Sequence, residues 1–224
     1  MKTFKHIHND PNLCDLNRIE HNGKRYYVSP NGDKLPSVTT FLSSFNKDSI
    51  IKWRKRVGEE EANRISAKAT RRGTKFHSLM ESYLNNEAGF LTNDVMPDMQ
   101  YAFWNMVPAL DRIDNIHYIE AMLYSTAVGL AGQVDLIAEY DGIPSIIDFK
   151  TSLKPKKEEW ITNYFEQGAA YSLMYKERVG NPINQLVTIM AVDNEQPLLF
   201  IEKTEDHIEG LVKAIQFYNN QKDR

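Results

Sequence analysis

The sequence predicts one mixed α/β domain, and three observations support this fold class. Segments with the two-residue alternation of strands and segments with the 3.6-residue period of helices follow one another along the chain. Their order is a helical front, a three-stranded meander, a helix, two strands and a final helix. The length of 224 residues suits one well-buried domain, and 42% hydrophobic and 25% charged residues are ordinary for a globular protein. We expect an N-terminal hairpin and helical part over residues 1–95 and an α/β core over residues 96–224.

Turn residues followed by helical patterns characterise the N-terminal part. The dipeptides Asn22-Gly23 and Asn31-Gly32 accept positive φ and indicate hairpin-like turns. Ser37 is a candidate N-cap for a short helix, and a further helix follows it. Gly73 is expected to interrupt the chain before an amphipathic helix over residues 74–84, whose apolar residues share one face.

Beyond residue 95, helical and strand patterns alternate. The first helix is expected to bury Tyr101, Trp104 and Leu110, and Gly180 is expected to end the longest helix. The predicted elements are helix 98–113, strands 117–124, 134–140 and 143–147, helix 158–179, strands 185–192 and 198–202, and helix 205–221.

Two aspartates are expected to face each other across one of these β-hairpins. The dipeptide Asp141-Gly142 is typical of a type I′ turn, in which both central residues have positive φ. If Tyr140 faces Ile143 across this two-residue loop, counting back along both strands sets Asp135 opposite Asp148. Their Cβ atoms would then lie roughly 4.5–5.5 Å apart.

This pair of carboxylates indicates a cation between them. Like charges at that separation repel, and Asp148 interrupts an apolar run in which an ionised group is costly. Lys150 lies two residues further along the strand and so shares the face of Asp148. An exposed ion pair of little energetic weight is the alternative, but the strand around Asp148 is too apolar for a solvated edge. A divalent metal is the simplest candidate.

Three polar side chains on predicted helices are further candidates. His77 lies at the margin of the apolar face of the 74–84 helix, where a packed and hydrogen-bonded histidine is the ordinary alternative to a ligand. Gln167 and Tyr171 are four residues apart on the long helix and therefore project together. An amide on a packed face needs hydrogen-bond partners, so Gln167 is not explained by packing alone.

Positive charge is concentrated between Lys52 and Lys75, although the net charge of the chain is −3. This segment contains nine basic and three acidic residues, the pattern of a phosphate-binding surface, with a solvated helix face as the alternative. Hydroxyl groups near the start of the first helix could also contact an anion. The candidate nucleic-acid contacts are Ser37, Thr39, Arg54, Arg56, Arg71, Arg72 and Lys75.

Composition excludes several other classes of site. The single cysteine, Cys14, rules out an internal disulfide, a four-cysteine zinc site and a self-contained iron-sulfur cluster. No apolar stretch approaches the roughly 20 residues that span a bilayer, and no secretory leader is recognisable, so we expect a cytoplasmic protein without membrane contact. The phosphate-binding motif Gly-x-x-x-x-Gly-Lys-Ser/Thr is absent, so a coupled ATPase would have to be another chain.

Four separated motifs together resemble the PD-(D/E)XK nuclease superfamily, in its RecB-like exonuclease branch. The segments LPSVTT (35–40) and Trp53-Arg54 are also similar to the front of phage-type and mitochondrial-genome-maintenance-type exonucleases. Val134 replaces the proline of the superfamily name, and Asp148 stands where many relatives have glutamate. The resemblance implies a restriction-endonuclease-like core with an N-terminal helical elaboration. The four motifs are RGTKFH (72–77), GQVD (132–135), DFKT (148–151) and QGAAY (167–171).

The resemblance also implies roles for individual residues. Asp135 and Asp148 would bind the metal together with the main-chain carbonyl of Phe149, and His77 would be a further ligand or phosphate partner. Lys150 would orient or activate the attacking water. Gln167 and Tyr171 would hold the catalytic groups and the substrate strand, and Glu120 is a further candidate ligand without a clear motif. Such hard oxygen ligands favour Mg²⁺ or Mn²⁺ over zinc.

These observations together predict a hydrolase of nucleic acids. The expected activity is a metal-dependent DNA exonuclease on single-stranded or end-processed DNA, with little sequence specificity. A structure-specific or restriction-type endonuclease and a catalytically silent nucleic-acid-binding module are the alternatives. The compact form without a recognisable targeting peptide suggests a phage or bacterial nuclease of DNA repair or recombination. Replication or recombination proteins are the expected partners, in the host cytoplasm if the chain is phage-encoded.

Overall fold

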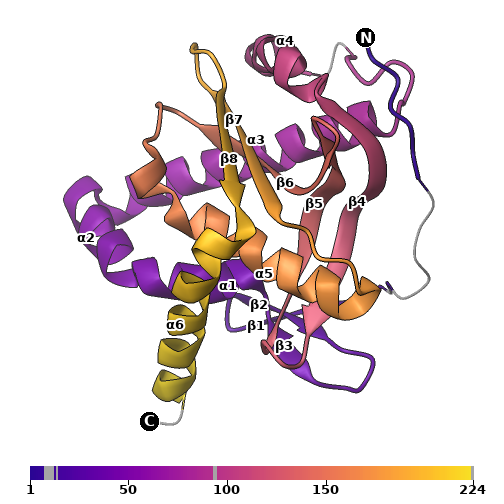
Figure 1. The fold of residues 1–224 in the computed structure, drawn as a ribbon. Helices are drawn as coiled ribbons and strands as arrows, with labels where there is room; N and C mark the ends of the chain where they lie inside the picture. The colour runs from indigo at the N-terminus through magenta and orange to yellow at the C-terminus, as the bar shows by residue number, and fades with distance from the viewer. Residues whose placement is uncertain (8–12, 14, 93–94, 223–224) are drawn as a thin grey trace.

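The computed structural model describes residues 1–7, 13, 15–92 and 95–222. A five-stranded sheet in the order β4-β5-β6-β7-β8 forms its centre, and helices flank this sheet (Figure 1). Strands β6 and β7 are parallel and the other neighbours are antiparallel, which confirms the predicted mixed α/β fold. The strands are β4 (Ile113–Ser125), β5 (Leu130–Tyr140), β6 (Ile143–Ser152), β7 (Gln185–Val192) and β8 (Leu198–Lys203).

A small antiparallel sheet precedes the central one, in the order β1-β2-β3. The predicted turn between its first two strands is present, because Asn22 and Gly23 have φ values of 52° and 68°. Ser37, directly after the third strand, pairs in a parallel bridge with Ala131 of β5 and so joins this sheet to the core. The strands are β1 (Asn17–His21), β2 (Lys24–Val28) and β3 (Lys34–Pro36).

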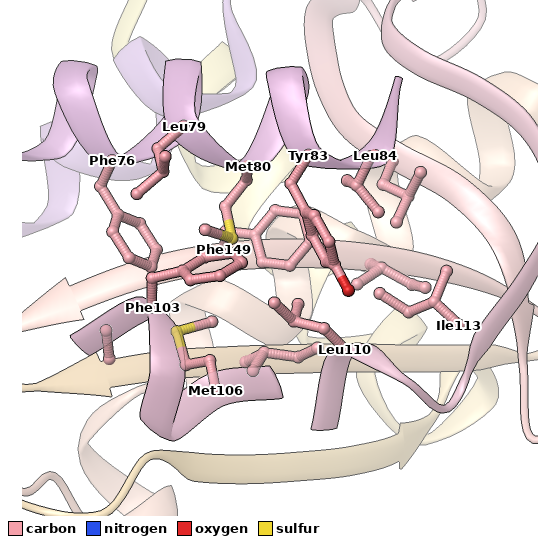
Figure 2. Packing of buried hydrophobic residues seen from close by; sticks show 14 of the residues in the cluster. Phe76, Leu79, Met80, Tyr83, Leu84, Phe103, Met106, Leu110, Ile113 and Phe149 are labelled. Carbon is pink, nitrogen blue, oxygen red and sulfur yellow. The ribbon is translucent and has the colours of Figure 1, made fainter. Parts of the chain in front are cut away.

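Helices pack on both faces of the central sheet and bury two separate clusters. One cluster joins α3 and α4 to the sheet, and Figure 2 shows Phe76, Phe103 and Phe149 meeting in it. The other joins α1, α5 and α6 to the opposite face through residues such as Phe41 and Phe165. The helices are α1 (Val38–Ser43), α2 (Lys47–Val57), α3 (Glu59–Leu84), α4 (Pro97–Leu110), α5 (Thr162–Val179) and α6 (Thr204–Lys222), with short 3-10 turns at Ser44–Asn46 and Glu158–Trp160.

Two expectations about helices were wrong. Gly73 does not interrupt the chain, because α3 runs without a break from Glu59 to Leu84. Burial of its apolar face stabilises this helix beyond the roughly 0.5–1 kcal/mol that a helical glycine costs relative to alanine. In α4, Tyr101 and Trp104 are 52% and 50% exposed, whereas Phe103 is buried. Phe103 makes edge-on contacts with Tyr83 and Phe90, which fixes the rotation of α4 about its axis.

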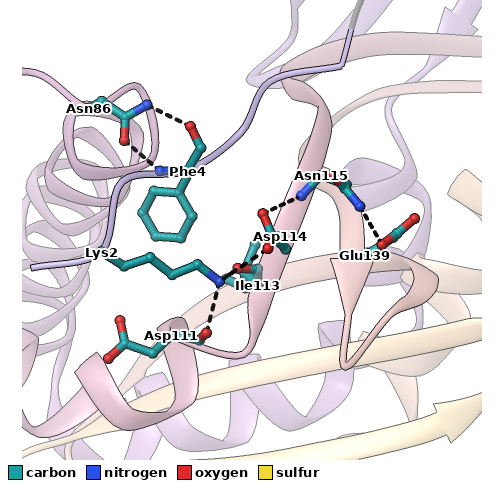
Figure 3. A network of polar contacts seen from close by, with 8 residues as sticks. All are labelled: Lys2, Phe4, Asn86, Asp111, Ile113, Asp114, Asn115 and Glu139. Atoms are coloured by element: carbon teal, nitrogen blue, oxygen red, sulfur yellow. Dashed lines mark hydrogen bonds and ion pairs between the residues drawn. The ribbon is translucent and has the colours of Figure 1, made fainter.

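The N-terminal residues are attached to the end of α3 and the start of β4 (Figure 3). Phe4 donates its N–H to Asn86 Oδ1 over 2.8 Å and accepts from Asn86 Nδ2 over 3.0 Å. Lys2 Nζ donates to the carbonyls of Asp111 and Ile113 over 3.0 and 2.5 Å. Phe4 is therefore held in the core beside Tyr83, with ring centroids 5.0 Å apart.

The hairpin of β5 and β6 forms with the predicted register. Asp141 and Gly142 have φ values of 52° and 77°, as a type I′ turn requires. Pairing runs from Tyr140 with Ile143 to Leu136 with Ile147 and ends one residue short of the two aspartates.

Within the described parts of the chain, no helix is long and apolar enough to cross a membrane.

Candidate active site

A cleft of about 430 Å³ lies between the small sheet, α3, the central sheet and α5. It brings together residues that are distant in sequence, including residues from each of the four motifs. Asp148 does not line it, but its ion-pair partner Lys150 does. The lining residues are Arg25, Tyr27, Ser37, Thr39, Gly73, Thr74, His77, Ser78, Glu81, Glu120, Gly132, Gln133, Asp135, Lys150, Gln167 and Tyr171.

Three of these side chains form a group that could hold a metal ion. One ligand atom from each of His77, Glu120 and Asp135 lies within 4.8 Å of the others. His77 Nδ1 is 3.4 Å from Asp135 Oδ2. Two carboxylates and one imidazole form a donor set that suits Mg²⁺ or, because of the nitrogen, still better Mn²⁺. It is the one such group that the described residues contain.

A distortion of β4 places Glu120 in this group. The neighbouring pairs, Ile119 with Leu136 and Ala121 with Val134, set Glu120 at the level of Asp135 on the adjacent strand. Glu120 has a φ of 54°, a conformation that costs on the order of 1–3 kcal/mol in a residue other than glycine. Burial, and then the charge of Asp135, raises the pKa of Glu120 to about 7. A nearby cation would favour the ionised form.

Asp135 connects helix α3 to the β5–β6 hairpin. Its Oδ2 accepts the main-chain N–H of Phe149 over 2.8 Å, so the side chain replaces the missing ladder contact between β5 and β6. Burial opposes ionisation of this carboxyl, but the hydrogen bond and charge of His77, together with the charge of Lys150 and the N–H of Phe149, lower its pKa. Burial likewise opposes a charged His77, whereas its contact with Asp135 raises the pKa of the imidazole. The resting site therefore contains an aspartate anion held by an imidazole.

Asp148 has different partners from Asp135. Its two carboxylate oxygens lie 2.6 and 2.5 Å from Lys150 Nζ, and Gln167 Nε2 donates to Oδ1 over 3.3 Å. Burial, assisted by the charge of Asp135 and opposed by Lys150, raises the pKa of Asp148 to about 6. The predicted pair of aspartates is thus divided in the structure: Asp135 lies in the cluster with His77, and Asp148 is bound to Lys150.

Lys150 is held as a buried ammonium group. Burial alone would lower its pKa, but the negative charges of Asp148 and Asp135 raise the pKa above its ordinary value. Its Nζ also lies 5.1 Å from the centre of the Tyr164 ring. As an ammonium group, Lys150 can donate hydrogen bonds and stabilise nearby negative charge, but it cannot accept a proton.

The helix α5 contributes Gln167 and Tyr171 to the wall of the cleft. Gln167 Nε2 lies 3.4 Å from the hydroxyl of Tyr171, as the four-residue spacing predicts. Tyr171 is 2% exposed, and its ring lies directly against Gly132 of β5. The absence of a side chain at Gly132 therefore determines how closely α5 approaches the site.

Replacing Gly132 with alanine is expected to displace Tyr171. The added Cβ would lie 2.8 Å from Tyr171 Cε1, and such overpacking typically costs 1–3 kcal/mol, that is about 2 kcal/mol of unfolding free energy. Gly73→Ala is the matched control, because nothing lies within 4 Å of its Cβ and the helix should gain about 0.5–1 kcal/mol. Chemical denaturation of both variants measures these changes, and equal stability of the two would contradict this packing.

The predicted basic surface is partly neutralised by ion pairs. Arg54 pairs with Glu59, and Arg72 pairs with Asp98 and Asp193, so both arginines tie structural elements together. Arg56, Arg71 and Lys75 are exposed on the same two helices, without an ion-pair partner among the described residues. Ser37 and Thr39 line the cleft instead, where Ser37 also caps α1 by accepting the N–H of Thr40.

Several cleft residues were not identified from the sequence. Arg25 and Tyr27 come from the small sheet, and the two-residue alternation of β2, which places them on one face, is the signal that could have indicated them. Glu120 was identified only as a candidate without a motif, because its position depends on the register of β4 with β5.

Sequence comparison relates part of the chain to named exonucleases. No protein-family model matches the chain. Mitochondrial genome maintenance exonuclease 1 of Mus musculus is 26% identical over 132 residues, which cover 55% of this chain and 39% of that protein. The Homo sapiens protein of the same name is 25% identical over 130 residues, which cover 54% of this chain and 38% of that protein. The chain therefore spans less than half the length of the curated relatives that it matches.

Among solved structures, a candidate exonuclease from Eubacterium rectale aligns with 82% of this chain and 64% of that chain, at 12% identity and a TM-score of 0.34. Over about half of its length, the chain is thus related in sequence to proteins named as exonucleases.

Proposed function

We propose that this protein is a divalent-metal-dependent nuclease that hydrolyses phosphodiester bonds in the cleft. One observation carries the proposal: the three-ligand cluster and Lys150, the ion-pair partner of the buried Asp148, line a single polar cavity. The sequence relationship to proteins named as exonucleases supports the same reaction class. We assign the activity to DNA, as an exonuclease acting on single strands or processed ends with little sequence specificity.

His77, Glu120 and Asp135 would hold the ion, with Asp148 and the carbonyl of Phe149 as further ligands. Mg²⁺ or Mn²⁺ bound there would lower the pKa of a water molecule and offset charge on the phosphate. Asp148 would have to share its carboxylate between the ion and Lys150, which it contacts at 2.5 Å. The main-chain N–H of Phe149 donates to Asp135 Oδ2 and would thereby orient this carboxylate toward the ion.

Lys150 would act on the reacting phosphate and the attacking water as a hydrogen-bond donor. Because Asp148 keeps the ammonium charged, Lys150 can stabilise negative charge that develops during hydrolysis. Gln167 would position the pair, since its amide contacts both Asp148 and Tyr171. Tyr171 is buried, and burial raises the pKa of its phenol, so we assign it a positioning role.

The N-terminal part, residues 1–95, would guide the nucleic acid and supply His77, and residues 96–224 would carry the other catalytic groups. Arg56, Arg71 and Lys75 are exposed on α2 and α3 and could contact phosphates. Arg54 and Arg72 would contribute less, because each is engaged by acidic side chains of the same chain.

Covalently closed single-stranded DNA tests the exonuclease assignment. With Mg²⁺ present, linear strands should be degraded while circular strands of the same sequence remain intact. Rapid nicking of the circles would favour a structure-specific or restriction-type endonuclease. Binding of both substrates without cleavage of either would favour a catalytically silent binding module.

The variant Glu120→Gln tests the metal cluster. The substitution keeps the size of the side chain but removes the charge, so we expect Mn²⁺ to bind about tenfold or more weakly. Calorimetric titration of the protein with Mn²⁺ measures this change. Glu87→Gln is the matched control, because Glu87 is exposed and lies outside the cluster. Unchanged Mn²⁺ affinity in Glu120→Gln would exclude Glu120 as a ligand.

A further inference from the structure

A second polar cavity adjoins the catalytic cleft on the side of the small sheet. It measures about 260 Å³ and shares Arg25 and Thr39 with the cleft, so the two spaces meet at these residues. Its remaining lining consists of Arg18, Glu20, Gly23, Thr40 and Ser43.

The register of the β1–β2 hairpin directs its charged residues to one face. Glu20 pairs with Arg25, and Arg18 is two residues from Glu20, so all three side chains share that face. Neither arginine has an ion-pair partner among the residues that the structure describes, even though Glu20 lies opposite Arg25. Two guanidinium groups and one carboxylate thus line this cavity, so positive charge is in excess there.

Hydroxyl groups of Thr39 and Thr40 also line this cavity. Ser37 Oγ donates to Thr40 Oγ1 over 2.8 Å, and Thr40 Oγ1 also accepts the main-chain N–H of Arg25 over 3.2 Å. Since both lone pairs of the Thr40 oxygen are occupied in this way, its own proton is available to an acceptor. Thr39 lies at the junction of the two cavities, and its hydroxyl is 3.0 Å from Ser37 Oγ.

We propose that this cavity is a phosphate subsite of the enzyme, in which Arg25 and Arg18 bind a second phosphate of the nucleic-acid strand. The inference rests on the proposed nuclease function and adds to it a binding position outside the metal cluster. Guanidinium groups bind phosphate oxygens through two parallel hydrogen bonds, and the hydroxyl of Thr40 completes a set of donors. None of the described residues that line this cavity is aromatic, so a phosphate fits it better than a stacked base.

Binding of a short single strand in EDTA tests the subsite without cleavage. We use a 3′-fluorescein-labelled oligothymidylate and measure fluorescence anisotropy over a range of salt concentrations. Arg25→Ala should weaken binding about tenfold or more, because a hydrogen bond to a charged group is lost. The slope of log Kd against log salt should fall by about 0.7 for one lost phosphate contact. Arg18→Ala should change both quantities in the same direction.

Lys24→Ala is the matched control for this experiment. Lys24 is exposed on the same strand and one residue from Arg25, so its side chain points to the other face of the hairpin. Its removal takes away the same charge and should change the Kd less than about twofold. Equal effects of Lys24→Ala and Arg25→Ala would show a general charge effect and overturn the subsite.

Oligonucleotides with and without a 5′-phosphate identify which phosphate is bound. If the subsite holds the terminal phosphate, the Arg25→Ala defect appears only with the phosphorylated strand. If it holds an internal phosphodiester, both strands show the defect equally. Wild-type affinity of Arg25→Ala and Arg18→Ala for both strands would overturn the subsite while leaving the nuclease assignment intact. A wild-type protein that neither binds these strands nor cleaves them with Mg²⁺ would overturn both.

Discussion

Replacement of Lys150 with methionine is expected to slow Mg²⁺-dependent cleavage of single-stranded DNA by at least about 10²-fold. Methionine keeps most of the length of the side chain but removes the charge that, in the proposed function, acts on the reacting phosphate. The expected defect lies in the rate at saturating substrate, because the ammonium acts on charge that develops in the transition state. Single-turnover cleavage of an end-labelled strand measures this rate directly.

The same substitution leaves Asp148 buried without its cation, so stability must be measured alongside activity. Breaking a buried ion pair typically costs 3–5 kcal/mol, and since the Lys150 side chain is 19% exposed we expect about 3 kcal/mol or less. Lys154→Met is the control, because Lys154 is exposed four residues further along the chain. A folded Lys150→Met protein that cleaves at the wild-type rate would show that Lys150 has no catalytic role.

Asp135→Asn is expected to have the largest effect, with loss of both metal binding and cleavage. Asp135 combines three functions, since it belongs to the three-ligand cluster, contacts His77 and accepts the N–H of Phe149. Asparagine fills the same space but removes the charge, so we expect cleavage to fall about 10³-fold. Mn²⁺ titration and the cleavage assay should report parallel losses.

Asp141→Asn is the matched control for Asp135→Asn. Asp141 lies at the tip of the same hairpin, where it pairs with Arg112 at the surface. Its substitution removes an equal charge from the hairpin and should leave metal binding and cleavage unchanged. Retention of Mn²⁺ binding by Asp135→Asn would contradict the assigned ligand set.

Local sequence signals predicted the turn and the register of the β5–β6 hairpin. The dipeptide Asp141-Gly142 determines the turn, and the turn determines the register as far as Leu136 and Ile147. The same reasoning could not predict the partners of the carboxylates beyond the last ladder pair. There Asp135 accepts the N–H of Phe149, a contact that depends on how the two strands separate.

Features that depend on contacts between distant segments were not predictable from local patterns. The position of Glu120 depends on the register of β4 with β5, which shifts between Asp114 and Tyr118. The pairing of Arg72 with Asp98 and Asp193 joins residues that no spacing rule relates. The orientation of α4 is set by the packing of Phe103 on α3, so Trp104 is exposed although its pattern predicted burial.

The most direct test of the proposed function is a Mg²⁺ titration of the cleavage of linear single-stranded DNA, labelled at the 5′ or the 3′ end. The assay compares the wild-type protein with Asp135→Asn and Asp141→Asn. We predict no cleavage in EDTA, a saturable increase with Mg²⁺ for the wild-type and Asp141→Asn proteins, and no detectable increase for Asp135→Asn. Cleavage that persists in EDTA, or that Asp135→Asn supports at the wild-type rate, would contradict a metal-dependent nuclease centre in this cleft.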